Sequence, residues 1–596
     1  MTGIVGGTVD QAQLREMVET LPQEPWYETE RFEAGEHGLA LRHHGEKDPK
    51  GYTFWGDGQA AGVIDGAVSN RDALGWDDQE LFERLRRSPE ATLRSLDGPF
   101  TIACVDAADD RVILATDKIG SRIPLYTTER GFAFASRLAP FLDYLDDPAI
   151  DTQGVSDLLL MGHMWSDTTL LEGVNAVHPA TIIEHRAGEI DERRYWKPDY
   201  RPAQPTAEYR HQLTNAFQGS VERTAETVTG DVGLWLSGGL DSRATANELA
   251  RAAEDGAFES LVTYTYDANP GGGINPRLAA ETAETLDIAN ETVPLTAERF
   301  VPVLEEAVAV TDGMVKWNTL LNLSAIYNID DRDPDVLMEG HEGALVGHHL
   351  CRHHLTDPDS LVQSMYQSEA TLAAEDVEDL MSVPVDPLGS FRKEARRIDE
   401  PTLEERAVDA HFQNYYGRLA HASNPVPRSQ VGTRVPYADE EFLSHVAKLP
   451  IPWRMGALPF SDGKLIYGLV EPKIKLIRAL NADLAEIPYE RSRLKPSAPY
   501  PLHVVGFFAA TAISQLLSKP TYGNASSRTE TWYNTHEGFR TKIDELLEAV
   551  GERPFIDGDA VASHQEQLGD GADMNAISAL TTLEVWLQGH FDRHQG

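Results

Sequence analysis

The chain has 596 residues, and its 52 Lys and Arg against 95 Asp and Glu give a formal charge of −43. Hydrophobic residues make up 41%, which is enough for packed cores and excludes wholesale disorder. Such an acidic surface repels nucleic-acid phosphate and anionic membranes, so we expect neither as a partner. Because salt screens the repulsion between carboxylates, we also expect a halophilic protein.

The sequence also indicates where the protein works. It contains no run of about 18 apolar residues, the length that suggests a membrane span. Its first residues lack the basic start and long apolar stretch of a signal peptide. Two cysteines, Cys104 and Cys351, are too few for a disulfide scaffold. We therefore expect a cytoplasmic protein.

Residues 1–196 are predicted to form a layered α+β domain. Residues 79–87 and 154–162 have helical patterns, and residues 181–195 are typical of a hairpin. The other β-rich runs are short and bounded by turn residues. These runs are Thr2–Val9, Gly62–Ala67, Thr101–Asp106, Arg111–Asp117 and Phe132–Ser136.

Residues 197–206 carry three prolines and no periodicity, so we interpret them as a linker to a second domain, 207–596. Strands and helices then alternate, which predicts a doubly wound parallel sheet, and after about residue 360 the pattern is mainly helical. The predicted elements are strands at 232–236, 261–266 and 335–338, and helices at 242–253 and 277–286.

The clearest chemical signal is Ser237-Gly-Gly-Leu-Asp-Ser242, between a predicted strand and helix. Gly238 and Gly239 allow the backbone to approach an anion, and the helix start adds N–H donors. Asp241 suits such a site if it holds a divalent cation that binds phosphate in turn. A Walker A loop is excluded because its Lys is missing. A capped glycine turn without function is the alternative.

This loop and several other segments resemble the glutamine-hydrolysing asparagine synthetase family. Residues 96–100, 111–120, 124–126, 134–136 and 193–196 follow the order of that family's glutaminase domain. In the second half, SGGLDS together with Arg434-Val-Pro-Tyr-Ala-Asp439 is similar to the synthetase domain, and Leu583-Glu-Val-Trp-Leu587 to its last helix. The resemblance covers nearly the whole chain.

The resemblance implies an N-terminal-nucleophile-type glutaminase sandwich, then an α/β ATP-pyrophosphatase domain with a mainly helical C-terminal part. It implies a ligase that uses ATP and Mg²⁺ to adenylate a small-molecule or peptide carboxylate and passes the acyl group to ammonia or another amine. A homodimer is compatible with the sequence, which does not specify an oligomeric state. The residues implied to bind the nucleotide are Leu236, Ser237, Gly238, Gly239, Leu240, Asp241, Ser242, Val262 and Thr263.

The glutaminase half departs from the family pattern. Thr2 stands where the family has its nucleophilic Cys, and an N-terminal Thr is a much weaker nucleophile than a thiolate. Asp65-Gly66-Ala67 replaces Asn-Gly-Glu and loses the carboxylate that would hold the glutamine ammonium group. We therefore expect this domain to be retained as architecture without glutaminase activity.

The synthetase half departs as well. The family's acidic motif, Ser-Gly-x-Gly-x-Asp-Glu, is replaced by a segment in which Glu339 and Glu342 are the candidate Mg²⁺ ligands. Crippled adenylation is the alternative. For the cation that neutralises departing pyrophosphate, the candidates are Lys495, Arg493 and Lys464, each of which could instead form a surface salt bridge.

Residues 341–354 hold five His and one Cys, ligand types suited to zinc or copper. No second pair of such residues follows at metal-binding spacing, so we favour a role beside the acceptor pocket or in a solvent-facing loop.

Two further hypotheses stay open for the whole chain. One is a true asparagine synthetase that uses aspartate with ammonia or glutamine. The other is a nucleotide-binding pseudoenzyme.

Overall fold

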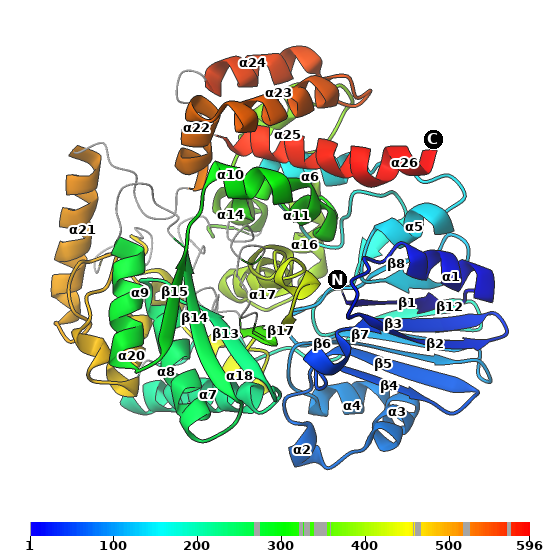
Figure 1. Cartoon of the computed structure of the whole chain (residues 1–596), viewed down its shortest axis with the longest axis horizontal. Coiled ribbons are helices and arrows are strands. Elements are labelled where there is room, and N and C mark those ends of the chain that lie inside the picture. The colour runs from blue at the N-terminus through cyan, green and yellow to red at the C-terminus, as the bar shows by residue number, and fades with distance from the viewer. Residues whose placement is uncertain are drawn as a thin grey trace.

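A computed structural model describes residues 2–204, 206–266, 274–320, 326, 334–338, 355–357, 359–456, 458, 467–516, 525–568 and 574–595. The N-terminal part is built on two antiparallel sheets, and the rest on one parallel sheet with many helices (Figure 1). The predicted fold class is confirmed.

The first sheet of the N-terminal part contains the start of the chain. All its neighbouring strands run antiparallel. In spatial order the strands are β10 (Val174–Ala176), β8 (Leu125–Thr127), β9 (Ala133–Ala135), β1 (Gly3–Gly7), β3 (His37–His43) and β2 (Glu28–Ala34).

The second sheet is also antiparallel throughout. Its strands are, in order, β12 (Glu189–Arg194), β11 (Thr181–Arg186), β7 (Arg111–Thr116), β6 (Phe100–Asp106), β5 (Ala60–Gly66) and β4 (Tyr52–Gly56). The predicted hairpin at 181–195 is confirmed as β11 and β12, with Ala187 and Gly188 at positive φ in its turn.

Apolar side chains at every second position join the two sheets into a sandwich. Ala103 and Val105 of β6 lie in one buried cluster with Ile4 of β1 and Leu39 and Leu41 of β3. Cys104, between the two β6 residues, is also buried, and burial raises the pKa of its thiol to about 12. It is therefore a core residue and not a ready nucleophile.

Six helices accompany the sandwich, of which α3 packs on β4 and β6. They are α1 (Gln11–Glu19), α2 (Arg71–Leu74), α3 (Asp78–Arg87), α4 (Pro89–Ser95), α5 (Ala139–Tyr144) and α6 (Thr152–Met161). Among the described residues, β12 is followed by no helix or strand before α7 (Ala207–Ala225).

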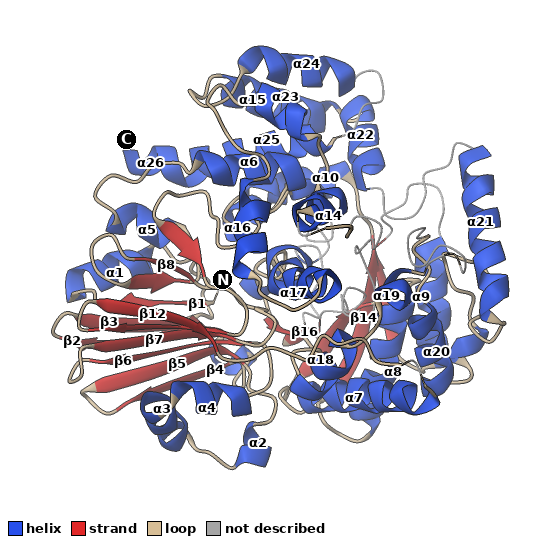
Figure 2. Ribbon diagram, turned by 180° about the vertical axis from the view of Figure 1, so that it is seen from behind, coloured by secondary structure: helices blue, strands red, loops and turns tan. Residues whose placement is uncertain are grey.

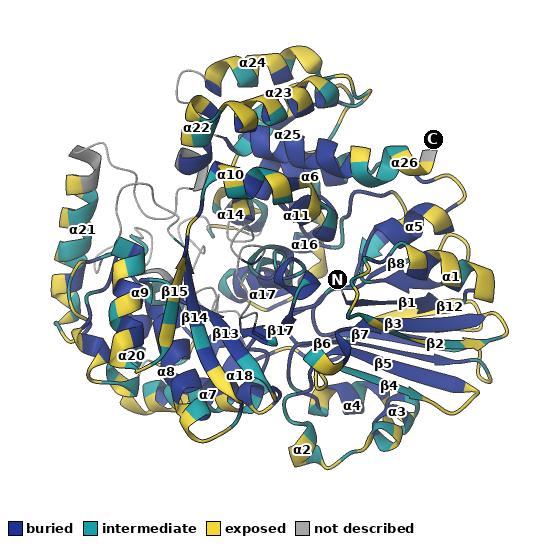
Figure 3. Cartoon of the chain, in the orientation of Figure 1, coloured by how far each residue is buried: buried dark blue, intermediate teal, exposed yellow. Residues whose placement is uncertain are grey.

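The parallel sheet has the order β15 (Ala289–Val293), β14 (Ser260–Tyr266), β13 (Asp231–Trp235), β16 (Val336–Met338) and β17 (Gly432–Arg434). The first strand along the chain is thus central, with its successors on both sides. β13 and β17 are largely buried (Figure 3), whereas the edge strand β15 is largely exposed.

Helices cover this sheet and extend from it (Figure 2). α8 and α9 pack against β14. The second half also contains α8 (Leu240–Glu254), α9 (Ile274–Thr285), α10 (Ala297–Phe300), α11 (Leu304–Val310), α18 (Glu440–Ala447), α19 (Ile451–Met455), α20 (Glu471–Leu480) and α21 (Tyr500–Leu516).

The remaining helices form the mainly helical part. They are α14 (Ser360–Glu369), α15 (Ala374–Leu380), α16 (Gly389–Arg397), α17 (Leu403–Tyr415), α22 (Ala525–Thr535), α23 (Glu537–Gly551), α24 (Gly558–Leu568), α25 (Asn575–Trp586) and α26 (Asp592–Gln595). Within the described part of the chain, every helix is too short or too polar to cross a membrane.

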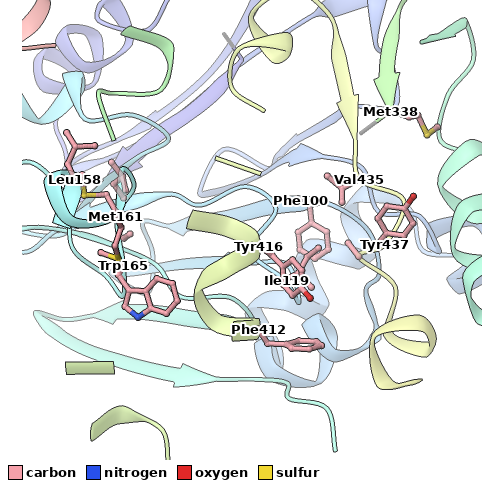
Figure 4. Close-up of a cluster of buried hydrophobic side chains, with 14 of the residues drawn as sticks. Phe100, Ile119, Leu158, Met161, Trp165, Met338, Phe412, Tyr416, Val435 and Tyr437 are labelled. Carbon is pink, nitrogen blue, oxygen red and sulfur yellow. The ribbon is translucent and has the colours of Figure 1, made fainter. Parts of the chain in front are cut away.

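The two halves share one hydrophobic core. Phe100 and Ile119 of the N-terminal part lie in the same buried cluster as Phe412, Tyr416 and Tyr437 of the second half (Figure 4). The halves therefore cannot separate without exposing apolar surface to water.

Candidate active site

The loop between β13 and α8 lies at the carboxyl edge of the parallel sheet. β14 and β16 flank β13 on opposite sides, so the strand order reverses at β13, and open α/β sheets bind their ligands at such a switch point. The Leu236 N–H donates to the Tyr264 carbonyl at 2.8 Å, and α8 begins at the buried Leu240. The sheet thus fixes the loop at both ends.

Side chains hold the loop in shape. The Ser237 N–H donates to Ser242 Oγ at 3.0 Å, and the two hydroxyl oxygens are also 3.0 Å apart. The Gly239 N–H donates to Ser237 Oγ at 3.2 Å, and the Gly238 N–H to Asn275 Oδ1. These side-chain oxygens accept the hydrogen bonds that the oxygens of a bound phosphate would take over, at a helix N-terminus whose dipole favours negative charge.

Asp241, in the first turn of α8, forms an ion pair with a lysine that the sequence did not point to. Lys473 Nζ lies 2.7 Å from Asp241 Oδ2, and its side chain is 9% exposed against 27% for Asp241. Lys473 occupies the first turn of α20, where the helix dipole disfavours a cation. A lysine in the first turn of a helix is unfavourable and therefore points to a functional role, but the sequence shows this only if the first residue of α20 is already known.

A second acidic residue, Glu490, lies against the loop glycines. It is 7% exposed, and a Cβ built on Gly238 would lie 3.3 Å from its Oε2, and one on Gly239 3.7 Å from its Oε1. The pKa of Glu490 is raised to about 7, mainly by burial; the charge of Arg491 opposes the rise and that of Asp241 adds to it. The sequence analysis considered this segment only for its cations and so missed Glu490.

Arg243 holds the Glu490 segment in place. Its guanidinium is fully buried and donates to the carbonyls of Leu484, Ile487 and Pro488 at 3.3, 2.9 and 3.1 Å. Burial lowers the pKa of Arg243 to about 10. This arginine of α8 therefore links the loop helix to the chain that carries Glu490.

The predicted cations lie in different surroundings. Arg493 is exposed with a positive φ of 60° and follows Glu490 by three residues, and its charge opposes the rise in the pKa of Glu490. Lys495 instead pairs at the surface with Glu486, with 3.0 Å between Nζ and Oε2. Lys464 lies outside the described residues. The assignment of a pyrophosphate-neutralising role to any of the three stays a prediction.

The predicted metal ligands Glu339 and Glu342, and the His and Cys cluster at 341–354, also lie outside the described residues. Val262 and Thr263 are in the middle of β14, where Thr263 Oγ1 donates to the Ala289 carbonyl at 2.8 Å. They are thus set back from the carboxyl edge, and their contact with a nucleotide stays a prediction.

The glutaminase-like half contains a buried ion pair within the Asp65-Gly66-Ala67 segment. Asp65 is buried and accepts a hydrogen bond of 2.6 Å from Arg122, which also reaches the Thr433 carbonyl of the other half at 3.3 Å. Asp65 and Arg122 line a cavity of about 90 Å³ between the halves. Thr2 and Ala67 are buried, and at Gly66 (φ +116°) a Cβ would come within 2.1 Å of the Pro99 carbonyl.

Comparisons with protein families match both halves. Residues 77–196 match a glutamine amidotransferase domain model, and residues 212–466 match an asparagine synthase model.

Curated relatives share part of the chain. It is 23% identical to Amidase chry2 of Gibberella zeae over 407 residues, and 23% identical to Amidase chyE of Penicillium rubens over 410. Each match covers 65% of this chain and 54% of the relative, so the chain spans about half the length of the curated relatives it matches.

The chain also has distant likenesses to solved structures. An allosteric regulatory enzyme of purine biosynthesis is 11% identical and covers 49% of this chain and 80% of its own, with a TM-score of 0.23. The U34-tRNA thiolase NcsA of Methanococcus maripaludis is 12% identical over 61% of this chain and 85% of its own, with a TM-score of 0.21. Scores this low support no structural argument.

Proposed function

Because this chain belongs to the asparagine synthetase family of carbon–nitrogen ligases, we propose that it is an ATP-dependent, AMP-forming amide synthetase. The observation that carries the proposal is the Asp241–Lys473 pair beside the SGGLDS loop, at the carboxyl edge of a parallel sheet. This arrangement provides anion-binding N–H groups, hydroxyls and a buried cation around one acidic side chain.

In the proposed reaction a substrate carboxylate oxygen attacks the α-phosphorus of ATP, and the bond to the bridging oxygen breaks. Pyrophosphate leaves with that electron pair. An amine then attacks the acyl carbon, loses a proton and displaces AMP. The loop N–H groups and the hydroxyls of Ser237 and Ser242 hold the pyrophosphate, while Lys473 offsets the charge that accumulates on it.

The site fits Mg²⁺, because Asp241 presents a partly exposed carboxylate beside the loop and Mg²⁺ is usually held by one or two carboxylates together with substrate phosphates. When bound, Mg²⁺ would neutralise phosphate charge. The loop and Lys473 would still hold and orient the phosphates.

We expect purified protein to catalyse ATP–pyrophosphate exchange in molar KCl and Mg²⁺ with one carboxylate from a panel that includes aspartate, glutamate and peptides. The exchange tests adenylation without requiring the amine. Exchange should disappear in Asp241→Ala, which removes the acidic group at the loop. A folded wild-type protein that shows no exchange with any acid would contradict the proposal and favour a pseudoenzyme.

We further propose that the glutaminase-like half is inactive, so that ammonia or another amine is taken directly from solution. Two observations support this: Ala67, which stands where the family has the glutamine-binding carboxylate, is buried and apolar, and the neighbouring Asp65 is already paired with Arg122. We expect no release of glutamate from glutamine, and Thr2→Ala should leave amide synthesis from the amine unchanged. Glutamate release that is lost in Thr2→Ala would overturn this part of the proposal.

A further inference from the structure

Glu490 is an unusual residue to find beside an anion-binding loop. Its Oε2 is buried and has no hydrogen-bond partner among the described residues. Leaving a buried carboxylate oxygen unpartnered costs free energy, so such groups usually have a bound partner in the working protein. The position of Glu490 against Gly238 and Gly239 means that this partner would lie at the loop itself.

A phosphate at the loop would meet two carboxylates. Asp241 lies in the first turn of α8, and Glu490 approaches the glycines from the chain that follows α20. Negative charges this close repel strongly in a partly buried site, because screening by water is weak there. A divalent cation between the carboxylates and the phosphates would turn this repulsion into attraction.

Lys473 and Arg243 do not occupy all the carboxylate oxygens that could bind this divalent cation. Among the described residues, Lys473 engages Asp241 through Oδ2 alone, so Oδ1 stays available. Arg243 is directed at main-chain carbonyls and not at Glu490. No three His, Cys, Asp or Glu side chains gather as a metal site in the described part of the chain, so the cation would need phosphate oxygens to complete its ligands.

We propose that Glu490 and Asp241 ligate, from two sides of the SGGLDS loop, the divalent cation that accompanies the phosphates of the nucleotide. The inference rests on the proposed function for the presence of a nucleotide. The cation site itself can be measured without any turnover. In this arrangement Glu490 binds the cation directly, whereas a carboxylate that is only buried beside the loop would not.

The test is binding of Mn²⁺, in place of Mg²⁺, to the full chain in molar KCl, measured by electron paramagnetic resonance with and without inorganic pyrophosphate. Wild-type protein should bind Mn²⁺ more tightly when pyrophosphate is present. Glu490→Gln keeps the shape but removes the charge. We expect it to weaken Mn²⁺ binding at least about tenfold, since loss of even an outer partner of a metal ligand typically costs that much.

Glu486→Gln is the matched control. It removes a carboxylate from the same segment, but one that is half-exposed and paired with Lys495 away from the loop. It should bind Mn²⁺ as the wild type does. Asp241→Asn, a second variant, should weaken binding as Glu490→Gln does, and it keeps the test decisive if Glu490→Gln fails to fold.

Three outcomes would overturn the inference: unchanged Mn²⁺ affinity in Glu490→Gln, tighter pyrophosphate binding in that variant, or no pyrophosphate-dependent Mn²⁺ binding in the wild type. The first would show that Glu490 is not a ligand of the cation, and the second that it repels phosphate. If any of them occurs while carboxylate-dependent exchange persists, the inference fails and the proposed function stands. Glu490-dependent Mn²⁺ binding without exchange would support the inference and contradict the proposed function.

Discussion

Replacing Lys473 by Met is expected to lower the rate of adenylation by roughly 100- to 1,000-fold, the cost typical of losing one group that stabilises developing charge. The Lys473 side chain is nearly buried, and its Nζ lies 2.7 Å from Oδ2 of Asp241, the acidic residue of the loop. Charge on the departing pyrophosphate grows as the α-phosphate bond breaks. The loss should therefore appear mainly in kcat and less in KM for ATP.

The same helix offers a matched control. Lys475 lies two residues further along α20 and pairs with Glu471 at 2.7 Å, with a third of its side chain exposed. Lys475→Met should leave the exchange rate unchanged, and circular dichroism should show both variants folded. Equal activity in Lys473→Met and the wild type would show that this lysine only balances the charge of Asp241.

The second large effect is expected at the junction of the halves, where Arg434→Met should lower the free energy of unfolding by about 3–5 kcal/mol. Arg434 is fully buried and binds Asp48 of the N-terminal part through two hydrogen bonds of 2.7 and 2.9 Å. It also donates to Thr227 Oγ1 at 2.9 Å. Removing the guanidinium leaves the Asp48 charge buried without its partner, and urea denaturation measures the loss.

Two further variants separate this effect from a general loss of an arginine. Arg186, like Arg434, is the last residue of a strand, but its pair with Asp109 is more than half exposed at 3.8 Å, so Arg186→Met should cost at most about 1 kcal/mol. The double variant Asp48→Asn with Arg434→Met should be more stable than Arg434→Met alone. Additive losses would show that the ion pair contributes little.

Local patterns in the sequence were sufficient for several elements. The strand before the loop and the helix after it follow from an apolar run that ends in Ser237-Gly238-Gly239, and the structure has β13 and α8 there. The hairpin at 181–195 follows from a Gly turn between alternating residues. Each signal is contained within a short stretch of consecutive residues, so no distant contact is needed to interpret it.

Strands that depend on their neighbours were missed. β2 is rich in charged side chains and half-exposed, and β3 is buried by its pairing with β1 and β2. β15 and β17 are short edge strands of the parallel sheet. Their extended conformation is stabilised by main-chain hydrogen bonds to other strands, which leave little trace in the local pattern of side chains.

The sequence by itself determined the family resemblance, the two-part fold class and the SGGLDS loop, because each depends on residues that are close in the chain. Only the tertiary structure placed Lys473 and Glu490 beside that loop, more than 230 residues away, and joined Asp48 to Arg434. Charge and burial at these positions depend on which surfaces meet after folding. No spacing rule links such residues, so their electrostatic partnership appears only in three dimensions.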